Sequence, residues 1–233
     1  MATYLQNLLL WSHQNDMRLN VTKTKEMVFG PWQRFNNDLL STSSGQIERV
    51  TQFKLLGLYV DSSMLWNMHV DYITKKAAQR LYFLKTLKRS GLTSEHLLHY
   101  YVAAIRPVLE YCSPVWSHNL PQYLSQQIES IQKRAIHIIF GATYRMPYLL
   151  ALSYADLSSL QHRRDTQARQ LFETILDPAS SIHSLLLPPR DQTVISRLRN
   201  PHRYPITIGR TKNINPLLIL HSKIINNHII DQI

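Results

Sequence analysis

Apolar and polar positions alternate most regularly between Gln52 and Arg89. The segment opens with an apolar run from Phe53 to Val60, interrupted by Gly57, whose composition predicts a β-strand. After a polar turn, apolar residues recur at every third or fourth position, which predicts one face of a long amphipathic helix. The residues of this apolar face are Trp66, Val70, Ile73, Ala77, Leu81, Leu84 and Leu87.

The opposite face of the same predicted helix is basic. Its cations are Lys75, Lys76, Arg80, Lys85, Lys88 and Arg89. No acidic residue occurs between Asp71 and Glu95 to balance them. Such a face is typical of helices that bind nucleic-acid phosphates, and it is equally typical of helices that are simply solvated. The pattern alone leaves both interpretations open.

The rest of the pattern predicts a helix and short strands before this helix, and further helices after it. The expected early elements are a helix over 3–16, strands at Glu26–Phe29 and Ile47–Val50, and a loop or hairpin connection at Phe35–Gly45. The expected later elements are helices at Thr93–Ile105, Leu120–Phe140 and Ser158–Leu176, with bends at Pro107 and Pro114. The predicted fold class is therefore α+β, with a short partial sheet, a mainly helical bundle and an irregular tail.

Composition adds mainly a statement about charge. The 233 residues carry a net charge of +11, which favours an anionic partner, nucleic acid first and a membrane surface second. No stretch approaches the ~20 apolar residues of a membrane span, and no signal-peptide pattern is present at the N-terminus. A single cysteine, Cys112, excludes an intrachain disulfide and a cysteine zinc cluster. We expect an intracellular protein, nuclear or cytoplasmic and not secreted, with no membrane partner.

Six short motifs resemble, in the same order, segments of the reverse transcriptases of non-LTR (LINE-type, jockey-like) retrotransposons. Leu19–Thr24 is similar to the LN..KT segment of the palm, and Phe53–Leu58 is similar to the yLG strand. Trp66–His69 is similar to the W..H that opens the thumb helix. The later motifs are Tyr111–Trp116, Gln132–Ala135 and Gln161–Arg164. The resemblance covers roughly residues 3–176. It implies a palm remnant over 1–62, a helical thumb-like and connection region over 63–178, and a basic, proline-containing extension over 179–233 that is partly ordered.

The resemblance implies an RNA-directed DNA polymerase, whose chemistry uses Mg²⁺ held by an adjacent aspartate pair. No two acidic residues are adjacent in this chain. The chain is therefore expected to be a truncated transposable-element fragment that lies downstream of the aspartate pair, with no catalytic residue, no metal site, no cofactor of its own and no stand-alone catalysis. Tyr154-Ala155-Asp156 resembles part of the aspartate motif, but it follows the thumb-like helices. We interpret Asp156 as the cap of the helix beginning near Ser158.

The function expected from the resemblance is non-specific binding of RNA or an RNA–DNA duplex through phosphates. The alternative is a transposon-derived helical module that binds proteins and has no nucleic-acid activity. The expected nucleic-acid-binding residues are Lys23, Lys25, Lys75, Lys76, Arg80, Lys85, Lys88 and Arg89. Arg163 and Arg164 lie early in a predicted helix, where cations oppose the macrodipole, so a phosphate or carboxylate partner is expected for them.

Five other side chains have a functional and a structural interpretation. Trp66, Trp116 and Tyr111 could stack on bases, but their apolar surroundings favour core packing. His69 lacks partners at metal-ligand spacing, so it is expected to cap or pack the start of the helix. Cys112 is expected to be buried and inert.

Overall fold

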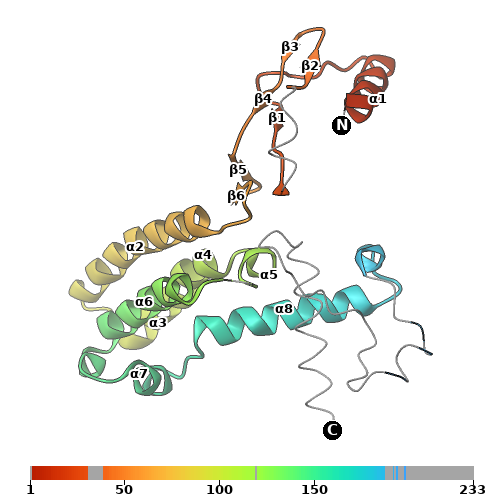
Figure 1. Ribbon diagram of the computed structural model, residues 1–233. Helices are drawn as coiled ribbons and strands as arrows, with labels where there is room; N and C mark the ends of the chain where they lie inside the picture. Colours follow the sequence, from red (N-terminus) through yellow and green to blue (C-terminus); the bar gives the residue numbers. More distant parts are fainter. Residues whose placement is uncertain are drawn as a thin grey trace. The chain divides into compact units, whose positions relative to one another are not determined.

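The computed structural model describes residues 2–30, 39–118 and 120–186, together with the single residues 191, 193 and 197. The chain divides into two compact units, Met1–Trp66 and Asn67–Ile233. The first unit holds one helix and all of the described strands, and the second is helical (Figure 1). The α+β class predicted from the sequence is confirmed. The expectation of a partly ordered extension over 179–233 lies mostly outside the described residues.

The first unit combines α1 (Ala2–Gln14) with very short strands. The pairings are β1 (Lys25–Glu26) parallel with β4 (Glu48–Arg49), β2 (Ser41–Thr42) antiparallel with β3 (Gly45–Gln46), and β5 (Gln52–Leu55) antiparallel with β6 (Leu58–Asp61). Each described sheet has two strands. Leu5, Ile47 and Leu58 are among the few apolar side chains that this unit buries. Two-stranded pairings of this kind are marginally stable without further packing.

The run from Phe53 to Val60 is a hairpin, and the expectation of one interrupted strand is wrong. Leu55 pairs with Leu58 across a two-residue turn formed by Leu56 and Gly57. Both turn residues have positive φ, +48° at Leu56 and +92° at Gly57, which is the signature of the type I′ turn that connects antiparallel strands. Gly57 therefore reverses the chain here.

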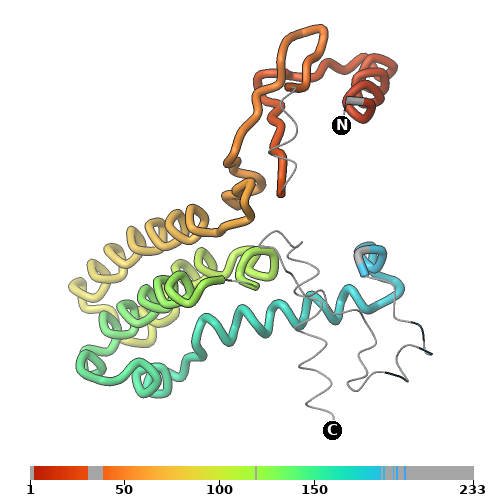
Figure 2. Tube along the Cα trace, viewed as in Figure 1, coloured from red at the N-terminus to blue at the C-terminus, as the bar shows by residue number. Residues whose placement is uncertain are grey.

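The second unit is a bundle of helices. Its main members are α2 (Asn67–Arg89), α3 (Ser94–Tyr100), a π-helical turn η2 (Tyr101–Ile105), α4 (Arg106–Glu110), α5 (Ser113–Trp116), α6 (Gln122–Ile139), α7 (Tyr148–Tyr154) and α8 (Leu160–Leu176). Short 3-10 turns, η3 (Gly141–Thr143) and η4 (His183–Leu185), follow α6 and α8. The chain turns back after α2 into α3, η2 and α4 (Figure 2). The core is built from the apolar faces of these helices.

Hydrogen bonds at both ends show that α2 and α6 run parallel. The Tyr123 hydroxyl donates to Asn67 Oδ1 at 2.8 Å near the start of both helices, and Lys88 Nζ donates to the carbonyl of Ile138 at their ends. Helix α8 runs antiparallel to α6, because Ser158, before the start of α8, accepts from Gln132, whereas Arg164, further along α8, donates to the earlier residue Ser125. These contacts place α2 at one edge of the bundle with α6 beside it (Figure 1).

Two local features of the bundle differ from the sequence expectation. Helix α7 was not predicted. Helix α8 begins at Leu160 with Ser159 as its N-cap, whose hydroxyl accepts from the amide of His162 at 3.2 Å. Asp156 has φ +51° in the turn that follows α7, so its expected role as the cap is wrong. Ser159 takes this role because it stands directly before the first helical residue.

Within the described residues, no helix is both long enough and apolar enough to cross a membrane.

Candidate nucleic-acid interface

Helix α2 has one buried and one solvent-exposed side. Val70, Ala77 and Leu84 lie on the side that is fully buried in the bundle. Five exposed cations lie on the solvent side: Lys88, whose partners are described below, and a group of four, Lys75, Lys76, Lys85 and Arg89. None of these four pairs with a carboxylate within the part of the chain that the structure describes. We call them the α2 cations; their charge is available to a partner outside this chain.

The other two cations of α2 have partners inside the bundle. Arg80 Nη1 donates to the carbonyl of Ala104 in η2, and Lys88 Nζ donates to the carbonyl of Ile138 and lies 3.4 Å from that of Ile139. The last carbonyls of a helix lack donors from their own helix, so Lys88 caps α6. The sequence groups all six cations on one face, whereas the structure separates Arg80 and Lys88, which bond to carbonyls of other helices, from the four α2 cations.

The two candidates near the N-terminus lie in the first unit, on elements other than α2. Lys25 is in β1 and forms an ion pair with Glu48 of the paired strand β4, so its charge is largely compensated. Lys23 is exposed, and its backbone amide donates to Asn20 Oδ1 at 3.1 Å in a turn. Neither lysine lies on the same structural element as the α2 cations.

Two aromatic residues that sequence reasoning overlooked lie among the α2 cations. Tyr82 is 66% exposed and Phe83 57% exposed, and their rings form an edge-to-face pair with centroids 5.9 Å apart. The signal for them was present in the sequence. Because Leu81 and Leu84 belong to the buried face, the two residues between them must point outward on a helix of 3.6 residues per turn.

The aromatic residues considered for base stacking are mostly structural. Trp116 is fully buried and Trp66 is buried, whereas Tyr111 is exposed. His69 is 1% exposed and lies edge-on to Trp116, with ring centroids 5.1 Å apart, so its expected packing role is confirmed. Burial lowers the pKa of His69 to about 4, so the ring is neutral at physiological pH. Cys112 is exposed, contrary to expectation, because it stands with φ +53° at the corner between α4 and α5.

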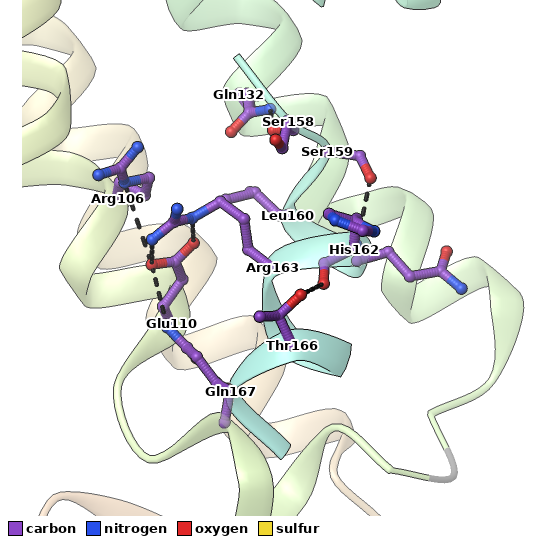
Figure 3. A network of polar contacts seen from close by, with 12 residues as sticks. Arg106, Glu110, Gln132, Ser158, Ser159, Leu160, His162, Arg163, Thr166 and Gln167 are labelled. Carbon is purple, nitrogen blue, oxygen red and sulfur yellow. Dashed lines mark hydrogen bonds and ion pairs between the residues drawn. The ribbon is translucent and has the colours of Figure 1, made fainter. Parts of the chain in front are cut away.

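The expected carboxylate partner of Arg163 is present. Arg163 of α8 contacts the buried Glu110 of α4, and Gln167 and Arg106 approach the same carboxylate (Figure 3). Arg164 is itself buried and donates to Ser125 Oγ at 3.1 Å, and burial lowers the pKa of its guanidinium. Both arginines therefore act within the bundle.

A second buried polar cluster joins α6 to the start of α8. The Tyr101 hydroxyl donates to Gln132 Oε1 at 2.5 Å, and the Tyr148 hydroxyl donates to Glu129 Oε2 at 2.5 Å. Glu129 also accepts from the amide of Gln161 at 2.6 Å, which satisfies one free N–H in the first turn of α8. Burial is the main cause that raises the pKa of both tyrosines. This cluster fixes helix positions and does not reach the α2 cations.

Among the described residues, no group of three or more His, Cys, Asp or Glu side chains gathers as metal ligands would. The geometry of α2 offers two exposed rings and four exposed cations that pair with no carboxylate of the described residues, on a helix that α6 holds in place. Cations on a fixed scaffold bind phosphates, and exposed rings bind bases.

Comparison with known proteins gives one match that overlaps this helix. The family model of the N-terminal part of the alkylated DNA repair protein alkB homolog 8 matches residues 66–106. The matched segment runs from the residue before α2 to the first residue of α4, which is less than a fifth of the chain. No curated protein and no solved structure matches significantly.

This match corrects the interpretation of the chain as a reverse-transcriptase fragment. The segment that the motif Trp66–His69 assigned to a polymerase thumb is the segment that the alkB homolog 8 family model matches, and no reverse-transcriptase family matches alongside it. The expected retrotransposon origin, and the function derived from it, are wrong. The interpretation relied on the order of the six motifs along the chain. Each motif is short and common, so their order alone does not identify a family.

Proposed function

We propose that this protein binds nucleic acid, RNA in the first instance, through phosphate contacts made by the α2 cations. The observation that carries the proposal is that, among the residues that the structure describes, none of these four exposed charges pairs with a carboxylate; Lys76 lies only over the ring of Tyr72. Every phosphate contact releases a condensed counterion, so such binding is sensitive to salt and insensitive to sequence.

Two further observations support a polyanionic partner. The chain carries a net charge of +11, and α2 contains one acid, Asp71, at its start. The family model that covers α2 takes its name from an alkylated DNA repair protein, which acts on nucleic acid. The expectation of an RNA–DNA duplex rests on the overturned resemblance, so the proposed ligand is RNA alone.

The fixed position of α2 also favours binding. Gln127 Nε2 donates to Asp71 Oδ1 at 2.9 Å and to Thr74 Oγ1 at 3.2 Å, which anchors the first turns of α2 to α6. Lys88 anchors the last turn. A rigid helix presents its cations without first ordering the backbone, which lowers the entropic cost of association.

The test is the affinity of the full chain for a fluorescent RNA, measured by anisotropy over a series of salt concentrations. Four contacts to a single strand predict that log K falls with log salt at a slope of about −3, or about 50-fold between 50 and 200 mM. Substituting Lys75, Lys76, Lys85 and Arg89 with Gln should weaken binding by tenfold or more and flatten the slope.

The matched control removes the same number of charges elsewhere in the helical unit. Lys133, Arg134, Arg145 and Arg169 are exposed and lie outside α2, so their fourfold Gln variant has the same net charge as the α2 variant. The control should keep most of the native affinity. If both variants lose affinity equally, binding depends on total charge, and the α2 site is rejected.

A further inference from the structure

We infer that the Tyr82–Phe83 pair makes this interface selective for single-stranded nucleic acid, by stacking on unpaired bases. The inference rests on the proposed function and adds to it the class of ligand. It starts from the two exposed rings, which lie on the same helix as the α2 cations and form an edge-to-face pair.

The position of the rings along the helix supports this assignment. Tyr82 stands seven residues after Lys75 and seven before Arg89, so all three lie on one side of α2. Phe83 has the same relation to Lys76. The aromatic pair is therefore placed along the cationic surface, with Lys75 and Lys76 about 10 Å before it, Arg89 about 10 Å after it and Lys85 within one turn, at 1.5 Å per residue. A strand held by its phosphates along α2 would pass over both rings.

The two rings are far more exposed than the aromatic residues that hold the core of the bundle. Trp116 is fully buried, and the buried Tyr101 hydroxyl is bonded to Gln132. Phe83 is more than half exposed, gains little from burial in this position and has no polar group to hydrate. Because the two rings pack edge to face, the ring faces that point away from the pair remain accessible for a planar base to stack on.

Stacking separates single strands from duplexes because only unpaired bases expose their faces. A base that stacks on an aromatic side chain contributes enough that its loss lowers affinity by about tenfold. In a duplex the bases are stacked on one another, so the rings cannot reach them, while the phosphates remain accessible to the α2 cations. Charge complementarity attracts both forms, and the rings favour the single strand.

The experiment compares one labelled RNA, single-stranded and annealed into a blunt duplex, with the native full chain and the double variant Tyr82→Ala/Phe83→Ala. We expect the variant to lose about tenfold in affinity for the single strand and less than twofold for the duplex. The variant Tyr82→Trp/Phe83→Trp should retain single-strand affinity, because indole rings also stack. Photocrosslinking of 4-thiouridine RNA to the native chain should label a peptide that contains Tyr82 and Phe83.

A control variant and the fourfold Gln variant of the α2 cations distinguish failure of the stacking inference from failure of the proposed function. Substituting two other exposed tyrosines, Tyr4 and Tyr144, with Ala should change neither affinity. If the fourfold Gln variant of the α2 cations weakens binding but the ring variant does not, the stacking inference fails and the proposed function stands. If the fourfold variant binds normally, the proposed function itself fails. Loss of self-association in the ring variant, without loss of single-strand affinity, would show a second copy as the partner of the rings and overturn the inference.

Discussion

Arg163 binds Glu110 with two hydrogen bonds that join α8 to α4. Nε donates to Oε1 at 2.5 Å and Nη2 donates to Oε2 at 3.1 Å. The Glu110 side chain is 8% exposed and the Arg163 side chain 33% exposed. Gln167 donates to the same carboxylate at 3.4 Å. The hydrogen bonds to Glu110 are the main reason that the pKa of Arg163 is raised.

Substituting Glu110 with Gln should therefore destabilise the helical unit. Removing one partner of a fully buried pair costs about 3–5 kcal/mol, and partial exposure of Arg163 reduces this to about 2 kcal/mol. The free energy of unfolding from urea titration, followed by circular dichroism, measures the loss. Arg106→Gln is the control, because its Nε lies 4.0 Å from the same carboxylate, and it should cost under 1 kcal/mol. Equal losses in the two variants would refute the special role of Arg163.

The long helices could be predicted from the sequence because their apolar stripes are regular. The expected helices at Leu120–Phe140 and Ser158–Leu176 lie within two residues of α6 and α8. Helix α7 was missed because seven residues are too few to show a period. The hairpin at Leu56-Gly57 was missed because Leu56, a poor turn residue, occupies a position that favours Asn or Gly.

The partners of Arg80 and Lys88, the other two cations of α2, could not be predicted in the same way. Arg80 and Lys88 donate to backbone carbonyls 24 and 50 residues away. A carbonyl is present at every residue, so nothing in the sequence marks which one accepts. The outward position of Tyr82 and Phe83, by contrast, follows from the helical phase of their neighbours, so this part of the candidate site was available from sequence.

Burial of His69 predicts that the bundle loses stability in mild acid. The pKa of His69 lies near 4 in the folded chain and near 6.5 when unfolded, so the unfolded chain takes up the proton first. The contribution of His69 to the free energy of unfolding is fully present above pH 6.5. It decreases as the pH falls from 6.5 to 4 and does not change further below pH 4. Between pH 7.5 and 5 this amounts to a loss of about 2 kcal/mol in the free energy of unfolding.

The measurement compares urea unfolding at pH 7.5 and pH 5 in the native chain and in His69→Gln, which cannot titrate. The drop in unfolding free energy should shrink in His69→Gln, whatever its stability at pH 7.5. His99→Gln removes an exposed histidine and should leave the native drop unchanged. A drop of the same size in all three proteins would show that other groups cause the acid sensitivity.

The turn of the β5–β6 hairpin predicts a stabilising substitution. Leu56 has φ +48° and is 84% exposed, so it bears the cost of a left-handed conformation, about 1 kcal/mol, and its side chain gains little from burial. Asn tolerates this conformation and is the preferred residue before Gly in a type I′ turn. Leu56→Asn should therefore slow hydrogen exchange of the β5 and β6 amides by about two- to fivefold, equivalent to about 0.5–1 kcal/mol. Gly57→Ala, at φ +92°, should do the reverse, because a Cβ is strained at that angle. Faster exchange in Leu56→Asn would show that the Leu56 side chain supports the hairpin through contacts that outweigh its backbone strain.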